Sequence, residues 1–317
     1  MLYPEFEELL QLRAKATNIA LISKRPVTST TAGSHISPFR GQGLEFEEVR
    51  EYTYGDDIRN IDWRVTARTG KPHLKLFTEE RERSVVLCVD MNKNMHFGTR
   101  GTFKSVQAAK IAATIAWAAN KNHDRVGACL YGDLLQDGRE YFAPKRSRKS
   151  LLSMLKTLCI TKDCVNKVEK DMEQISTSIK PLDDTVLYLN KMVNSGTLIF
   201  IISDFMNITE TLEQCLINLH KRNEVVLIPV NDPADKEIPA AGNIIFSEYD
   251  IRQNLHVNTN NNNGRKAYKQ QWLDNQQKLE DLASKLHIGV IHIATNEDFC
   301  HKLAYNLKIV NLFNKGA

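Results

Sequence analysis

The sequence predicts an α/β fold, with a doubly wound and mostly parallel sheet that begins near residue 84. The first observation is a series of short apolar runs rich in β-branched residues, at 84–90, 125–131, 197–203, 224–230 and 287–293. The second is that stretches with helical spacing separate these runs. The third is that the runs are apolar throughout instead of alternating, which is typical of strands covered on both faces.

Composition restricts the class of protein. The chain has 317 residues, of which 42% are hydrophobic, so a sizeable core is expected and global disorder is not. Its 42 Lys and Arg residues nearly balance its 38 Asp and Glu residues, and the net charge of +4 does not by itself indicate nucleic acid or membrane binding. The first residues lack the basic start and apolar block of a signal peptide, and no run reaches the roughly 18 apolar residues of a membrane span. We therefore expect a soluble, cytoplasmic protein.

The segment before residue 84 differs from the rest of the chain. Residues 4–24 carry apolar residues at helical spacing and predict a short amphipathic helix, whereas residues 26–43 are rich in turn-forming residues and predict a loop. Residues 44–83 are dense in charge and have no long apolar run. We expect residues 1–83 to form a charged N-terminal extension and residues 84–317 to form the α/β domain.

Helices are predicted between the strands. They span residues 103–120, 151–159, 182–193, 210–220 and 266–286. Residues 138–144 predict a short edge strand, because Pro144 cannot donate a hydrogen bond within a sheet. Residues 260–264 are polar and turn-prone, and predict a loop.

Polar residues follow two of the predicted strands. The first strand ends at Asp90 and continues through Asn92 and Asn94, and the third is followed by Asp204. Ligands of open α/β sheets lie at the carboxyl ends of strands where the strand order reverses. Two carboxylates and two amide oxygens could provide part of the oxygen shell of Mg²⁺. The alternative is structural, because an Asp after a strand also caps helices and turns.

This pattern resembles the metal-ion-dependent adhesion site of von Willebrand factor A domains. Their first loop reads Asp-x-Ser-x-Ser, and Asp90 and Asp204 match the first and the last Asp of that site. The chain departs from the pattern because Asn92 and Asn94 replace the two serines, and because Thr185 lies several residues too late to match the middle-loop Thr. The resemblance implies a von Willebrand factor A-like, Rossmann-type domain and a degenerate Mg²⁺ site formed by Asp90, Asn92, Asn94 and Asp204.

A second resemblance covers the charged segment. Its matching stretches are residues 40–46, 50–63, 66–68, 79–81 and 228–233. They resemble the bacterial domain-of-unknown-function family fifty-eight, whose members carry this block before a von Willebrand factor A-like domain. Genes of that family commonly neighbour those of MoxR-type AAA+ ATPases. The resemblance therefore implies an adaptor that works with such an ATPase.

Acids and arginines alternate in this charged block. Bidentate Arg–carboxylate pairs fix geometry, and an aromatic residue among them would add an apolar anchor. We interpret the block either as a clasp between domains or as a docking surface for a partner. Its residues are Arg50, Asp56, Asp57, Arg59, Asp62, Trp63 and Arg68.

Three classes of function are compatible with these features. The first hypothesis is a non-enzymatic binding or adaptor module that uses the strand-end site. The alternative is a metal-dependent hydrolase with His96 as general base, although the sequence has no GxSxG or HExxH motif. Nucleic-acid binding through the basic run 145–149 ranks last, because the run has no interleaved aromatic residue and is typical of a solvated helix start.

Overall fold

The computed structural model of the chain forms two compact units. One unit combines Met1–Pro26 with Arg83–Ala317, and the other is Val27–Glu82. The structure describes residues 3–19, 21, 44–54, 58, 61–79, 83–133, 135, 137–159, 181–247 and 254–313. The predicted loop at 26–43 lies outside the described residues.

The large unit is built on a seven-stranded sheet with the order β10-β7-β6-β3-β4-β5, in which β11 also pairs with β7. All neighbouring strands are parallel except β5, which runs antiparallel at the edge beside β4. The strands are β3 (Ser84–Asp90), β4 (Arg125–Tyr131), β5 (Arg139–Lys145), β6 (Leu198–Ser203), β7 (Glu224–Asn231), β10 (Gly289–Val290) and β11 (Ile293–Ala294). An α/β fold with a mostly parallel sheet is thus confirmed.

The strand order reverses beside β3. The chain leaves β3 toward β4 on one side and later returns to β6 on the other side. A crevice at the carboxyl ends of two such strands is the usual ligand position in open α/β sheets. The topology therefore places the ends of β3 and β6 at the position that the sequence analysis selected.

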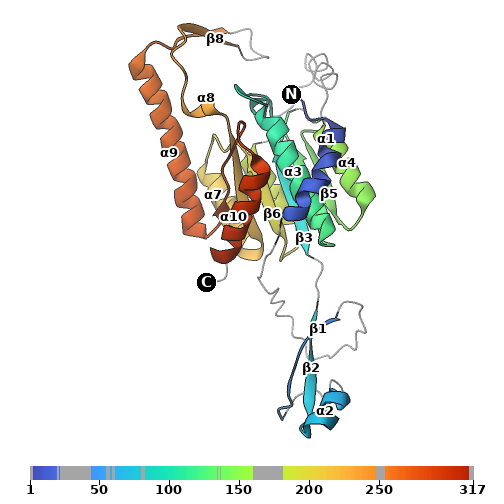
Figure 1. Cartoon of the computed structure of the whole chain (residues 1–317). Coiled ribbons are helices and arrows are strands. Elements are labelled where there is room, and N and C mark those ends of the chain that lie inside the picture. The colour runs from blue at the N-terminus through green and yellow to red at the C-terminus, as the bar shows by residue number, and fades with distance from the viewer. Residues whose placement is uncertain are drawn as a thin grey trace. The chain divides into compact units, whose positions relative to one another are not determined.

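One face of the sheet packs against helices α1 (Phe6–Lys15), α3 (Lys104–Lys121), α4 (Arg148–Leu158) and α10 (Phe299–Phe313). Val85, Leu87 and Val89 of β3 point into this core. Helix α3 is Ala-rich and buried along most of its length, which allows it to lie close to the strands. In Figure 1, α3, α1 and α10 lie in front of the strands.

The other face packs against α6 (Leu182–Met192), α7 (Glu210–Arg222) and α9 (Asn262–Leu286). The alternate residues of β3, Val86 and Cys88, point to this side. Because both sets of alternate residues are buried, β3 is apolar at every position from Val85 to Val89, as the continuous apolar run predicted.

The N-terminal helix packs with the α/β unit, although the expected domain boundary at residue 83 would separate the two. Trp117 of α3 donates a hydrogen bond from Nε1 to the carbonyl of Leu9, at 2.9 Å, and Leu9 and Leu12 are buried in the same core as α3. Helix α1 is therefore part of the α/β unit, and its apolar stripe is the face that covers α3. The helix is also shorter than predicted, because it ends at Lys15 and a 3-10 turn (Ala16–Asn18) follows it.

The small unit contains an antiparallel pair, β1 (Leu44–Glu51) and β2 (His73–Glu79), and the helix α2 (Trp63–Thr69). Asp62 caps α2 by accepting hydrogen bonds from the backbone N–H groups of Arg64 and Val65. Gly70 ends the helix with a φ of 73°, a conformation that glycine adopts without strain. The sequence analysis missed these elements because it relied on continuous apolar runs, whereas apolar and charged residues alternate in this hairpin.

Other elements of the large unit were also missed. They are the short helix α8 (Pro233–Lys236), the hairpin β8 (Asn243–Ser247) with β9 (Asn254–Asn258), and α10. The predicted loop at 260–264 is wrong in part, because α9 begins at Asn262 and Asn261 caps it. The predicted strand at 287–293 is divided into the two short strands β10 and β11.

Candidate functional site

The carboxyl ends of β3 and β6 bring the predicted site residues together. Val89 of β3 is level with Ile202 of β6, so Ser203 and Asp204 follow beside Asp90. Asn94, on the short 3-10 helix η3 (Lys93–Met95), donates from Nδ2 to Asp204 Oδ2 at 2.8 Å. Asp90, Asn92, Asn94 and Asp204 therefore form one cluster.

Asp90 is a buried acceptor of three hydrogen bonds. Its Oδ1 accepts from the backbone N–H of Asn92 at 3.0 Å and from Asn92 Nδ2 at 2.8 Å, and its Oδ2 accepts from Ser203 Oγ at 2.7 Å. Burial and the neighbouring charge of Asp204 raise the pKa of Asp90 to about 6, although these hydrogen bonds oppose the shift. The carboxyl group is thus fixed in position and costly to ionise.

Asp204 is held by a lysine that the sequence analysis did not select. Lys104 Nζ lies 3.0 Å from Asp204 Oδ2 and 3.4 Å from Asp235 Oδ2. Lys104 and Asp204 are each only 3% exposed. A lysine is almost never buried unless it is paired. In the sequence it is simply the first residue of a helix, where a lysine is ordinarily solvated, so no local signal identifies it.

The loops after β3 and β4 are joined at Asn92. Asn92 Oδ1 accepts from the backbone N–H of Asp133 at 3.2 Å, and Asp133 Oδ1 accepts from the backbone N–H of Lys93 at 2.9 Å. Gly132 permits this approach, because a Cβ there would lie 2.4 Å from the backbone carbon of Met91. The amide of Asn92 is therefore oriented at both of its ends.

This donor set does not fit a magnesium ion. Mg²⁺ requires oxygen ligands, yet both asparagines direct their amide nitrogens toward the carboxylates, and the oxygen of Asn92 is already used by Asp133. The ammonium of Lys104 contacts the Asp204 oxygen that faces the cluster. Among the described residues, no group of three His, Cys, Asp or Glu side chains is arranged to hold a metal ion.

A further buried acid, Asp232, follows β7. Asp232 Oδ2 accepts from Thr295 Oγ1 at 2.6 Å and from the backbone N–H of Thr99 at 2.9 Å. Asp235 Oδ2, which contacts Lys104, also accepts from the backbone N–H of Asp232 at 2.8 Å. The polar network therefore continues from β3 and β6 to β7.

Comparison with known proteins identifies the family. The family model described as "Protein of unknown function DUF58" matches residues 48–278, which is more than half of the chain. The chain belongs to this family. DUF58 relatives include the uncharacterized protein Rv1480 of Mycobacterium tuberculosis and the uncharacterized protein Mb1516 of Mycobacterium bovis. Each is 29% identical over 239 residues, which cover 75% of this chain and 71% of the relative.

Solved structures resemble this DUF58 protein only distantly. One is the conserved hypothetical protein BatB of Bacteroides thetaiotaomicron, with 12% identity and a TM-score of 0.43. Another is an aerotolerance-related membrane protein of Bacteroides fragilis, with 13% identity and a TM-score of 0.42. Each match covers 74% of this chain and all of the other chain. Scores this low define neither the fold nor the function of the DUF58 chain. In the described part of the chain, no helix is long and apolar enough to cross a membrane.

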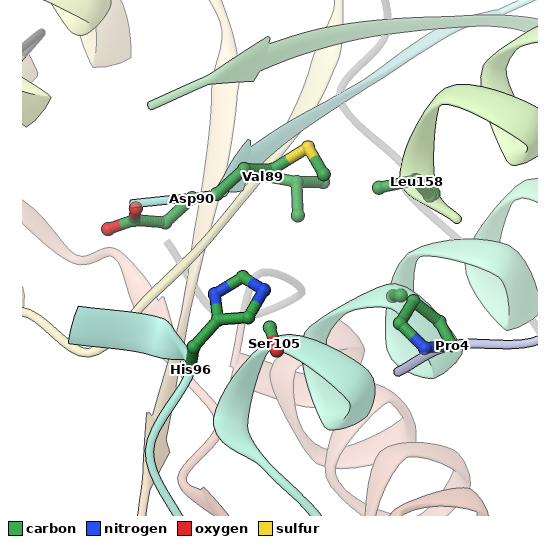
Figure 2. A pocket seen from close by; sticks show the side chains of 8 residues that line it. Pro4, Val89, Asp90, His96, Ser105 and Leu158 are labelled. Atoms are coloured by element: carbon green, nitrogen blue, oxygen red, sulfur yellow. The ribbon is translucent and has the colours of Figure 1, made fainter. Parts of the chain in front are cut away.

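A small cavity lies beneath the strand-end site of the DUF58 domain. Figure 2 shows His96 and Ser105 facing it among the apolar side chains of Pro4, Val89 and Leu158. Its volume is about 10 Å³, which is close to the minimum for one water molecule. His96 Nδ1 and Ser105 Oγ are buried there without a hydrogen-bond partner, and burial lowers the pKa of His96. The cavity brings a histidine, a serine and Asp90 together but leaves no room for a substrate.

The charged block of the DUF58 signature belongs to the small unit. Asp62 caps α2, and Arg50 Nη1 donates to Thr53 Oγ1 at 2.9 Å. Trp63 is 68% exposed on α2, and Arg68 is exposed in the last turn of the same helix. Asp56, Asp57 and Arg59 lie outside the described residues. Within the small unit, the ring of Trp63 is therefore not packed into a core.

Proposed function

We propose that this DUF58 protein is a non-enzymatic, protein-binding adaptor, and that its partner is a MoxR-type AAA+ ATPase. The partner and a von Willebrand factor A-like fold for the large unit are what the family resemblance implies. A cytoplasmic location is proposed because the first residues lack the features of a signal peptide. The binding surface is the carboxyl edge of β3 and β6. Two features support this choice of surface. The polar side chains there are buried and hydrogen-bonded to one another, and exposed apolar side chains lie beside them.

Those apolar side chains are Phe97 and Met206. Phe97 lies on the loop after β3 and is 36% exposed, and Met206 lies on the loop after β6 and is 40% exposed. The two loops are joined by the hydrogen bond between Asn94 and Asp204. A few exposed apolar side chains can supply much of the binding energy of a protein interface when a partner buries them. Met side chains also adapt to different partner shapes.

The hydrolase alternative has less support. A general base needs a free acceptor within reach of a substrate. Asp90 already accepts three hydrogen bonds, and His96 faces a cavity of only about 10 Å³. A catalytic role would require the loops after β3 and β6 to open. The hydrogen bond that Asn94 donates to Asp204 opposes this opening.

Met206→Ser is expected to weaken binding of a purified MoxR-type ATPase from the same organism by about tenfold, because one buried methionine contributes roughly 1–3 kcal/mol to an interface. The matched control is Met192→Ser. Met192 is 44% exposed, but it ends α6 just before β6 begins, at the opposite edge of the sheet. Biolayer interferometry with the full chain measures both affinities. Equal affinities for the two variants would place the binding surface elsewhere.

Trp63→Ala tests the small unit as a second docking surface. Because Trp63 is mostly exposed, we expect thermal unfolding of the full chain to change by no more than about 0.5 kcal/mol. If the ATPase covers this ring, its affinity falls by tenfold or more, as is common for exposed tryptophans at interfaces. A clear loss of stability would instead support the clasp between domains. Circular dichroism melting and interferometry on the same sample separate the two interpretations.

A further inference from the structure

The buried lysine at the strand-end site has an unusual environment. Lys104 is the first residue of α3, yet its side chain points inward and is 3% exposed. Its ammonium contacts one carboxylate that follows β6 and another that follows β7, Asp204 and Asp235. The ring of Phe97, at 5.9 Å, covers it further. One cation therefore joins α3 to the ends of two neighbouring strands.

The buried carboxylates around Lys104 need a positive charge beside them. Asp204 and Asp235 are nearly inaccessible to solvent, and the carboxyl group of Asp90 lies close to that of Asp204. A buried carboxylate is costly unless an opposite charge or several hydrogen-bond donors compensate it. Asn94 gives Asp204 one further donor, and the backbone N–H of Asp232 gives one to Asp235. The ammonium supplies the positive charge that these amides lack.

We propose that Lys104 permanently takes the place of a divalent cation at this site. The ammonium has the charge, the burial and the carboxylate contacts that a metal ion would have there, and it is covalently attached to the chain. The site is therefore closed to Mg²⁺ in the native protein. Removing the ammonium opens a cation site between Asp204 and Asp235, to which Asn94 can add its amide oxygen by rotating. This inference concerns the site itself and does not depend on the proposed partner.

The test uses the full chain and compares Lys104→Ser with the native protein. Thermal unfolding is followed in EDTA, in Mg²⁺ and in Mn²⁺. The native protein should have the same melting temperature in all three. Lys104→Ser should melt lower in EDTA, because two buried carboxylates lose their counter-ion. Its melting temperature should then rise with the concentration of Mg²⁺ or Mn²⁺, as for any ligand that binds only the folded state.

Lys110→Ser is the matched control. Lys110 lies on the same helix, and its Nζ is 2.6 Å from Glu8 Oε1, away from the strand ends. This variant also loses an ion pair, but divalent cations should not restore its stability. Adding Asp204→Asn to Lys104→Ser should abolish the restoration. If divalent cations raise the melting temperature of Lys104→Ser no more than that of Lys110→Ser, the proposal is wrong.

A direct titration decides the question even if Lys104→Ser does not fold. Mn²⁺ binding to the native chain is measured by electron paramagnetic resonance, with Asp204→Asn in parallel. If no Mn²⁺ binding depends on Asp204, the result supports the proposal that Lys104 occupies the cation site. Binding to the native chain that Asp204→Asn removes would show that a metal ion and Lys104 share the site, and would overturn the proposal.

Discussion

Gly132→Ala is expected to destabilise the α/β unit by about 2–5 kcal/mol, because backbone strain and a steric clash act at the same residue. Gly132 has a φ of 146°, a conformation that side chains oppose. An added Cβ would lie 2.4 Å from the backbone carbon of Met91 and 2.5 Å from the backbone nitrogen of Asn92. No side chain can move away to relieve these contacts. The loops after β3 and β4 would have to separate, and the bonds between Asn92 and Asp133 would break.

Gly242→Ala is the control that separates the effect of backbone strain from the effect of a steric clash. Gly242 also has a positive φ, of 80°, but nothing lies within 4 Å of a Cβ built there. It should cost only about 1 kcal/mol. Urea unfolding of both variants, followed by tryptophan fluorescence, measures the difference. Similar losses for Gly132→Ala and Gly242→Ala would mean that the two loops are not held in contact as described.

Asp90→Asn is expected to stabilise the protein at pH 8 by up to about 3 kcal/mol, which is the free energy of a pKa raised from 3.8 to about 6. A folded-state pKa above the unfolded value means that the folded protein binds the proton more tightly. The contribution of Asp90 to stability therefore falls as pH rises from about 4 to about 6, and stays low above pH 6. Asparagine has nearly the same shape and no charge, so the gain should disappear near pH 4.

Asp232→Asn should have the opposite sign. Burial alone would raise the pKa of Asp232, but hydrogen bonds from Thr295, Thr99 and Ala234 lower it below the usual value. The ionised form therefore stabilises the fold, and this stability is lost as pH falls. Melting temperatures of both variants from pH 4 to pH 8, in EDTA and in Mg²⁺, provide the measurement. If Asp90→Asn lowers the melting temperature at pH 8 in Mg²⁺ but not in EDTA, Mg²⁺ binds at the site. That result would contradict the role proposed for Lys104.

The sequence predicted the sheet well because its strands are buried on both faces. The bounds of β3 and β4 match the apolar runs at 84–90 and 125–131, and Pro144 correctly indicated an edge strand. The small unit shows the converse, since β1 and β2 carry alternating charge and have no apolar run to detect. Helix α1 was recognised as amphipathic, but the sequence could not show that α3 is the surface it covers.

The sequence by itself determined the parallel sheet, the family and the approach of Asp90, Asn92, Asn94 and Asp204, because strands that end in polar residues align at one edge. Only the tertiary structure decided what these residues do there. Which end of an asparagine amide faces a carboxylate depends on donors from other loops, such as the backbone of Asp133. The position of Lys104 between Asp204 and Asp235 depends on three elements that are distant in sequence. Whether a lysine can balance the charge of two buried carboxylates depends on distances between side chains in the folded protein, and the order of residues does not give these distances.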